Sequence, residues 1–301
     1  MTLFDPAVVP PDGGGVTGPG DGSPGGDLSA DAGREHDPAA PGGPLVRVRM
    51  RVAYDGTGFR GFAAQPGQRT VAGALAGALE AAVGRPVKLV CAGRTDAGVH
   101  ALDQVVHLDL PGALADPDRL ARAANRQLAP AVTVRAACVA DAGFDARRSA
   151  TSRRYRYEID NAPACDPLRA RFSWWVRHPL DLAAMRLGTD PLLGEHDFAA
   201  FCRRPPGLAA PLVRRVLDAC WRREGDERLV FEIEANAFCH QMVRSVVGML
   251  VRVGRGRLPA GEVGGVIASG ERSLAGSPAP ARGLCLVAVR YGERRPGQPR
   301  A

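Results

Sequence analysis

A short stretch around Asp96 combines an acid, a base and two glycines at the end of an apolar, strand-like run. Arg94 and Asp96 follow residues 87–92, and Gly93 and Gly98 lie on either side of the carboxylate. A nearby cation favours the charged form of a carboxylate, and glycines let a substrate approach the backbone closely. Such an aspartate can act as a nucleophile. The same residues also suit an ordinary turn, because aspartate and glycine are common in turns.

The elements that must position this stretch are short strands with helices between them. The alternation of apolar and polar residues predicts strands at 46–52, 87–92, 104–110, 132–138, 153–160, 213–224, 229–236 and 284–291, and helices at 71–82, 116–128, 182–193, 238–253 and 262–268. Strands with one apolar and one polar face predict an α+β fold with a mainly antiparallel sheet covered by helices. Two similar lobes, 45–150 and 151–295, would flank a shared cleft.

Charge is distributed unevenly along the chain. Residues 1–44 hold seven acids and one base, a balance of −6, so the net charge of +7 leaves +13 for residues 45–301. The first segment is rich in Gly, Pro, Asp and Ala and cannot offset its ordering entropy by burial, so it is predicted to be disordered, as are residues 296–301. All but one of the bases, Lys88, are arginines, which match phosphates well and indicate a nucleic-acid partner.

Several classes of protein are disfavoured by what the sequence lacks. There is no apolar run long enough for a membrane span and no signal-peptide pattern at the N-terminus. Seven cysteines without a C-x-x-C pair do not suggest a disulfide framework or a zinc site, so a reducing cytoplasm is expected, and Cys239-His240 is interpreted as core packing. The sequence contains neither a G-x-G-x-x-G motif after a strand nor a G-x-x-x-x-G-K motif, so no nucleotide cofactor is expected.

Three ordered blocks of residues carry a family resemblance. They are AGRTDAGVHA at 92–101, SATSRRYRY at 149–157 and NAFCHQMVR at 236–244, and Asp197-Phe198 with Phe201 and the segment 283–289 fit the same pattern. In these blocks, and over almost all of residues 46–292, the chain resembles the tRNA pseudouridine synthase A family. That family isomerises uridines in the anticodon stem-loop of tRNA, at tRNA positions 38–40.

The resemblance implies a role for each matching residue. Asp96 would be the nucleophile, and Arg94 would lie beside the flipped nucleotide. Tyr155 would stack on the target uracil and could take part in proton transfer, and Arg244 would pair with Asp96. Further substrate contacts would come from Gly93, Gly98, His100, Arg147 and Arg154. The resemblance also implies two ferredoxin-like (RRM-like) lobes around a basic active-site cleft, a homodimer in which one tRNA contacts both subunits, and no cofactor or required metal.

The chain departs from the family pattern in two places. Where relatives commonly read Gly-Trp-x-Arg-Gln, residues 61–65 are Gly-Phe-Ala-Ala-Gln, so one arginine that could contact RNA is missing. Where Phe-His-Ala-Arg is common, Asp145 replaces the histidine and places an acid near the expected RNA path, which Arg148 can offset. Neither change affects the proposed catalytic residues.

Two other classes of function compete with an RNA-isomerising enzyme. A non-catalytic RNA-binding protein would keep the basic cleft, but it has no need for a carboxylate that faces RNA phosphates. A metal-dependent hydrolase could use Asp96 together with His100, although no third ligand accompanies this pair in the sequence.

Overall fold

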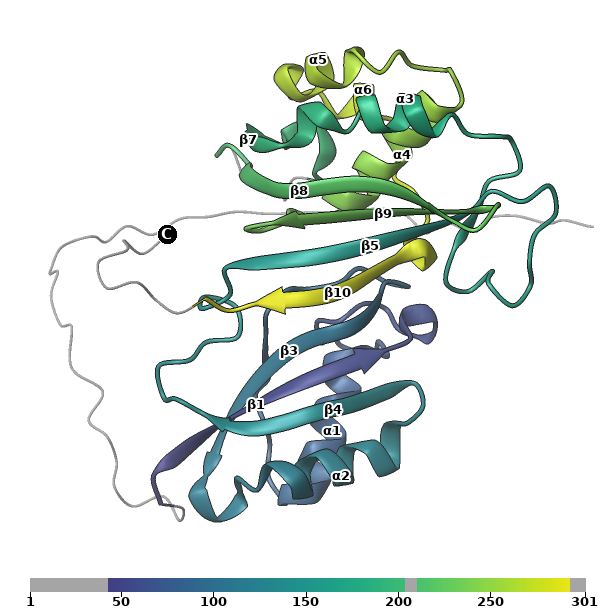
Figure 1. Cartoon of the computed structure of the whole chain (residues 1–301). Coiled ribbons are helices and arrows are strands. Elements are labelled where there is room, and N and C mark those ends of the chain that lie inside the picture. Colours follow the sequence, from purple (N-terminus) through teal and green to yellow (C-terminus); the bar gives the residue numbers. More distant parts are fainter. Residues whose placement is uncertain (1–42, 204–209, 293–301) are drawn as a thin grey trace, which may run out of the picture. The chain divides into compact units, whose positions relative to one another are not determined.

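Ten strands are joined in one sheet in the computed structural model, which describes residues 43–203 and 210–292 (Figure 1). The strands are β1 (Leu45–Tyr54), β2 (Val90–Cys91), β3 (His100–Pro111), β4 (Val132–Ala140), β5 (Ser152–Asp160), β6 (Trp174–Trp175), β7 (Gly194–Asp197), β8 (Val213–Glu224), β9 (Arg228–Ala235) and β10 (Leu284–Arg290). Their order is β4-β1-β3-β10-β5-β9-β8-β7, with β2 beside β3 and β6 beside β5. The pairs are antiparallel except β3–β10 and β5–β6. The predicted α+β class with a mainly antiparallel sheet is confirmed.

The last strand joins the two halves of the sheet. β10 lies between β3 and β5, and its parallel pairing with β3 is short, matching Cys285 with His100 and Leu286 with Ala101. This short pairing begins four residues after Asp96, so the loop that bears the carboxylate enters the sheet at the junction of the two halves. The division into lobes at 45–150 and 151–295 stays a prediction. The disorder predicted for residues 1–44 and 296–301 falls, except at 43 and 44, outside the described residues.

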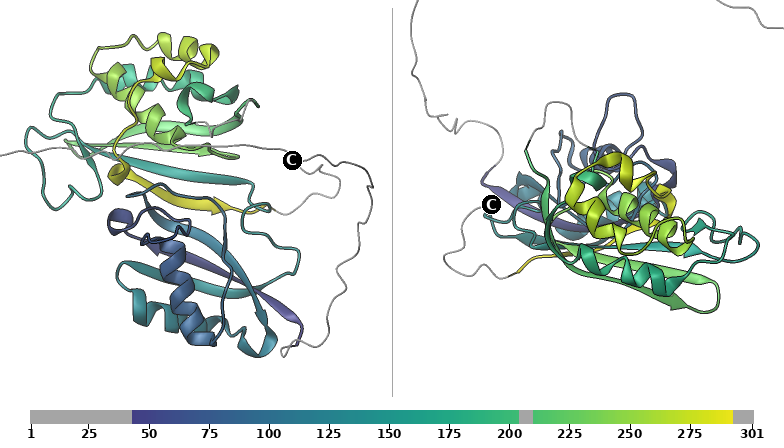
Figure 2. Two further views of the ribbon diagram at one scale, coloured as in Figure 1. Left: turned by 180° about the vertical axis from the view of Figure 1, so that it is seen from behind. Right: turned by 90° about the horizontal axis from the view of Figure 1, so that it is seen from above.

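Six α-helices of the described part accompany the sheet. They are α1 (Val71–Val83), α2 (Pro117–Leu128), α3 (Leu182–Leu187), α4 (Met242–Gly254), α5 (Glu262–Ser269) and α6 (Arg272–Ala275). The first two begin as the sequence predicts, because the side chains of Thr70 and Asp116 accept hydrogen bonds from the backbone of Gly73 and Arg119. In the view from behind in Figure 2, α1 lies in front of the N-terminal strands, while Figure 1 shows α3, α5 and α6 grouped beyond β8.

Three predicted boundaries are wrong, and each has a local reason. The helix predicted at 238–253 begins only at Met242, because Gln241 has a left-handed backbone with φ of 67°. The helix predicted at 182–193 ends at Leu187, and Gly188 and Pro191 follow. The strand predicted at 87–92 pairs with β3 only at Val90 and Cys91. Within the described residues, none of the helices combines the length and apolar character that a membrane crossing requires.

The two faces of β5 differ in chemistry. Side chains alternate along a strand, so Arg153, Tyr155 and Tyr157 share one face and Arg154 and Arg156 the other. On the second face, arginines and carboxylates of β5, β8 and β9 form a connected array of ion pairs, which includes Arg154–Glu234, Arg156–Glu232 and Arg222–Glu232. The first face is buried, and its Tyr155 lies within reach of the charge of Asp96.

Candidate active site

Asp96 forms an ion pair with a residue that is 148 positions away in the chain. Its Oδ2 lies 3.1 Å from Nη1 of Arg244, and the side chains of Asp96 and Arg244 are 23% and 16% exposed. Arg244, on the first turns of α4, also donates from Nε to the carbonyl oxygen of Ala279 at 2.8 Å. The guanidinium is therefore held in place by two partners, and it balances the charge of the carboxylate while leaving that carboxylate partly open to solvent.

His240 contacts the other oxygen of the same carboxylate. Its Nε2 lies 3.4 Å from Oδ1 of Asp96, and its side chain is 49% exposed. The interpretation of Cys239-His240 as core packing is therefore wrong for the histidine, which lies at the surface beside the acid. Helical spacing could not have found it, because the helix begins only at Met242 and His240 lies in the turn before it.

Tyr155 lies in the interior next to Asp96. Its side chain is buried, and its ring meets that of Phe238 edge to face with centroids 5.0 Å apart. Burial raises the pKa of the Tyr155 phenol, and the negative charge of Asp96 raises that pKa further. The phenol is therefore neutral at physiological pH. Tyr157, two residues further, donates instead to the carbonyl oxygen of Pro280 at 2.7 Å.

The loop that bears Asp96 is fixed by side chains from β1 and β3. The hydroxyl groups of Tyr54 and Thr95 lie 2.8 Å apart, and Gln104 donates to the carbonyl oxygen of Gly93 at 2.6 Å. Gly98 has φ of 78°, a conformation that favours glycine, and a Cβ there would lie 3.3 Å from that of Ala281. A Cβ on Gly93 would meet no atom within 4 Å, so this side of the loop is open.

Arg94 and Arg147 present free cations near this loop. Both side chains are exposed, and within the described residues neither makes a hydrogen bond or an ion pair with its guanidinium. Asp145, which departs from the family pattern, accepts hydrogen bonds from the backbone of Arg147 and Arg148, and its pKa is lowered, with those donors outweighing its partial burial. Its charge is thus directed at the backbone of the turn that carries Arg147.

Two of the predicted substrate contacts lie away from Asp96. Arg154 is on the opposite face of β5 from Tyr155 and pairs with Glu234, and also with Glu232 and Asp218. His100 is buried, accepts a hydrogen bond at Nδ1 from the backbone of Gly56 and contacts the carbonyl oxygen of Arg282 through Nε2. Burial lowers the pKa of His100, so its imidazole is neutral and joins backbone segments.

Arg153 connects the segments that carry the site, a role that no sequence pattern indicates. Its buried guanidinium donates to the carbonyl oxygens of Ala92, Arg147, Ala150 and Asn236. Its bonds involve Nε and both Nη atoms, and within the described residues no carboxylate pairs with it. Ala92 leads to Asp96, Arg147 is an exposed cation, and Asn236 leads to His240. Arg153 therefore ties these three segments together.

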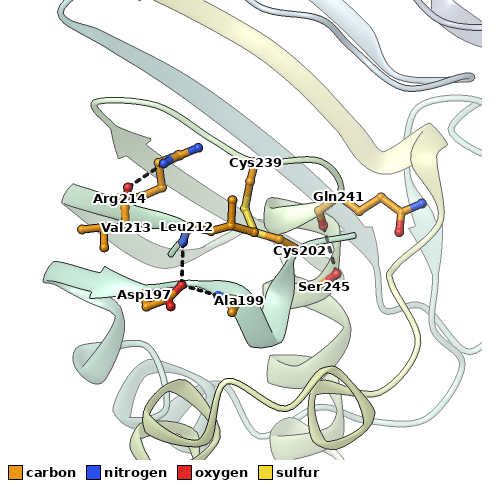
Figure 3. The surroundings of a disulfide bond; sticks show 9 residues. All are labelled: Asp197, Ala199, Cys202, Leu212, Val213, Arg214, Cys239, Gln241 and Ser245. Carbon is orange, nitrogen blue, oxygen red and sulfur yellow. Dashed lines mark hydrogen bonds between the residues drawn. A yellow bond between two sulfur atoms is a disulfide. The ribbon is translucent and has the colours of Figure 1, made fainter. Parts of the chain in front are cut away.

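A disulfide joins Cys202 and Cys239 beside this site (Figure 3). The expectation that the cysteines form no disulfide is wrong for this pair, because two cysteines 37 residues apart in sequence meet with Cα atoms 5.7 Å apart. The five other cysteines are free. The disulfide attaches the residue before His240 to the segment after Phe201, so it is part of the support of the active-site loop.

The comparison with known proteins agrees with this geometry. A family model described as tRNA pseudouridine synthase matches residues 190–292, which include α4 and β10. The tRNA pseudouridine synthase A of Frankia casuarinae is 49% identical over 251 residues, which cover 82% of this chain and 90% of the relative. The chain belongs to the tRNA pseudouridine synthase A family. The resemblance inferred from the three sequence blocks is thereby confirmed.

Other members of the family match over a similar length. The tRNA pseudouridine synthase A of Methylobacterium nodulans is 44% identical over 251 residues, 83% of this chain and 97% of the relative. That of Leifsonia xyli is 42% identical over 266 residues, 82% of this chain and 92% of the relative. The similarity therefore extends over nearly the whole length of these relatives.

Proposed function

We propose that this chain isomerises uridine to pseudouridine in tRNA and that Asp96 is its nucleophile. The observation that carries the proposal is the ion pair between Asp96 and Arg244, formed by two blocks that lie far apart in a chain of this family. A partly exposed carboxylate with a fixed counter-charge is suited to attack an electrophilic carbon and then to leave.

The reaction needs a group of this kind and little else. Isomerisation breaks the bond between N1 and C1′, turns the uracil and forms a bond between C5 and C1′, with no net oxidation. Asp96 can serve as the covalent partner at C1′ of the sugar or at C6 of the base. The protein must in addition take the base out of the RNA stack, which costs a few kcal/mol.

Aromatic and cationic side chains support the displaced nucleotide in this proposal. Tyr155, which lies beside Asp96, offers a ring for the uracil, and base–aromatic stacking is worth about 1–3 kcal/mol. That magnitude helps to hold the base but is too small to lower the chemical barrier by itself. Arg94 is exposed and free of partners within the described residues, which suits a residue that keeps the RNA open.

The finer features of the substrate complex belong to the same proposal. The substrate would be the anticodon stem-loop of cytoplasmic tRNAs, bound by a homodimer in a basic cleft between two ferredoxin-like lobes, without a nucleotide cofactor. The net charge of +13 on residues 45–301 favours RNA, and so does a cavity of about 560 Å³ that Arg203 and Arg272 line beside the disulfide. The competing metal-dependent hydrolase would require His100 to act together with Asp96, but the ring nitrogens of His100 contact the backbone of Gly56 and Arg282 and the carboxylate of Asp55 instead.

Asp96→Asn tests the proposal. The substitution keeps the size of the side chain but removes the nucleophile, so we expect pseudouridine formation to fall by roughly a thousandfold or more while tRNA binding survives. Pseudouridine mapping of total tRNA from cells with and without the gene measures the reaction and identifies the positions. Retained activity in the variant would contradict the mechanism, and inhibition of the wild-type protein by chelators would favour the hydrolase.

A further inference from the structure

His240 is a second functional group on the nucleophile. Its Nε2 faces Oδ1 of Asp96 at 3.4 Å, while Arg244 holds Oδ2 at 3.1 Å. Within the described residues, these are the two cationic or titratable partners that contact the carboxylate. Arg244 is mostly buried, whereas half of the His240 side chain is open to solvent. The imidazole can therefore exchange protons with water and with a bound base.

The backbone around His240 is constrained, which indicates a required position. Gln241 has φ of 67° and is the single non-glycine residue with positive φ in residues 43–203 and 210–292. Such a conformation is strained in a residue that has a Cβ, and it persists only where neighbours enforce it. Here the carbonyl oxygen of His240 accepts from the backbone of Arg203 at 3.0 Å, and Cys239 is bonded to Cys202 (Figure 3). The turn brings His240 and Arg244 to the same carboxylate.

The reaction needs a proton acceptor after the new bond has formed. Once C5 is joined to C1′, C5 still carries a hydrogen that must leave as a proton. The buried Tyr155 is poorly suited to accept it, because burial and the charge of Asp96 raise the pKa of its phenol and keep it protonated. The imidazole of His240 lies beside Asp96, and histidine is the side chain that most often acts as a general base.

We propose that His240 removes the C5 proton of the rearranged uracil. The C5–H bond breaks, its proton passes to Nε2 of His240, and its electron pair restores the double bond between C5 and C6. The electron pair of the C6=N1 double bond, which formed when C5 joined C1′, moves to N1, and N1 takes up a proton from water. If Asp96 is instead bonded to C6, the bond between C6 and the Asp96 oxygen breaks and its electron pair returns to the carboxylate. The exposed imidazole then releases the proton to water. This inference rests on the proposed function, since it concerns a later step of the same reaction.

The test is chemical rescue of His240→Ala with imidazole. We expect the single-turnover rate of pseudouridine formation to fall by about 10²-fold while tRNA binding is kept, and added imidazole to restore part of the rate. In this variant, deuterium at C5 of the target uridine should slow the reaction, and this isotope effect should shrink as added imidazole restores the rate. More basic substituted imidazoles should rescue better. His178→Ala, which removes another exposed histidine, is the matched control and should match the wild-type rate.

His240→Gln separates a base from a merely structural contact. Glutamine can hold Asp96 through a hydrogen bond but cannot take up the proton. We therefore expect His240→Gln to form pseudouridine as slowly as His240→Ala. Recovery of the rate by glutamine, or loss in alanine without rescue and without an isotope effect, would overturn the proposal. So would a wild-type rate in His240→Ala. If the wild-type protein itself makes no pseudouridine, the proposed function fails as well, and that control distinguishes the two failures.

Discussion

The two oxygens of Asp96 are in different chemical surroundings. Oδ2 is paired with Arg244, whose guanidinium is also fixed to the carbonyl oxygen of Ala279, and Oδ1 faces the more exposed His240. A carboxylate held at one oxygen keeps its orientation while the other oxygen remains available for bond formation. This asymmetry makes Oδ1 the better candidate for the attacking atom.

Single residues of this site differ in how far the sequence could reveal them. Asp96, Arg244, His240 and Arg153 all lie in the three sequence blocks. The family resemblance implied a partnership only for Asp96 and Arg244, and the structure pairs them. His240 and Arg153 are joined to the site by contacts across the fold, one to a carboxylate and the other to backbone carbonyls. Backbone carbonyls have no sequence signature, and for this reason the part played by Arg153 could not be read from the chain.

Arg153→Lys is expected to slow catalysis more than it weakens binding. Lysine offers three donors on one nitrogen and cannot reproduce the planar fork that reaches Ala92, Arg147 and Asn236, and an unsatisfied buried polar group costs about 1–3 kcal/mol. Misplacement of Asp96 by a fraction of an ångström to an ångström should lower kcat by up to about 10²-fold. Single-turnover rates and tRNA binding measure the two effects separately.

The control for this variant is on the same strand. Arg156→Lys changes an arginine that faces the opposite side of β5 and pairs with Glu232, so it should leave kcat unchanged. Equal losses of kcat in both variants, or a loss in Arg153→Lys that only follows a fall in melting temperature, would contradict a positioning role.

At the scale of elements, the strands are more predictable than the connections between them. Apolar alternation located β1, β5, β8 and β9 well because each has one side in the core. The start of α4 and the disulfide were missed, since both depend on how Gln241 and Cys202 are held by distant neighbours. The place of β10 between the halves likewise depends on pairing that a single strand pattern does not encode.

The ion pairs among β5, β8 and β9, on the face of β5 that carries Arg154 and Arg156, predict a pH dependence of stability. Glu232 is mostly buried, and hydrogen bonds from Arg222 and then Arg156 lower the pKa of its carboxyl group to about 2, against an ordinary value of 4.5. Because the pKa is lowered in the folded state, the charged Glu232 stabilises the fold fully above about pH 4.5. This stabilisation is lost as the pH falls toward 2. A shift of this size corresponds to on the order of 3 kcal/mol.

Glu232→Gln should therefore lower the free energy of unfolding at neutral pH by an amount that shrinks as the solution is acidified. Urea unfolding at neutral pH and at about pH 3 measures the difference. Glu195→Gln, which neutralises an exposed glutamate without an ion pair within the described residues, is the control and should change little at either pH. A destabilisation by Glu232→Gln that is the same at both pH values would show that the charge of Glu232 is not its cause.

At the scale of the whole molecule, the uneven distribution of charge along the sequence is the property that bears most on RNA binding. The balance of −6 in residues 1–44 opposes the +13 of residues 45–301. RNA binding depends on salt because arginines displace counterions from phosphates, so an acidic segment in the same chain could compete for those arginines at low salt. Its composition offers few large apolar residues for a packed core, which favours a segment that does not take part in catalysis.

Deletion of residues 1–44 is expected to leave the turnover of tRNA unchanged. Within the described residues, the groups that contact Asp96 are His240 and Arg244, and the arginines proposed to contact RNA also lie outside this segment. Steady-state kcat and tRNA affinity at low and moderate salt provide the measurement. The matched control is a full-length chain in which the seven acids of the segment are replaced by Asn or Gln. A large rise in affinity at low salt in both variants, absent at moderate salt, would contradict the prediction and identify the segment as an electrostatic competitor of tRNA.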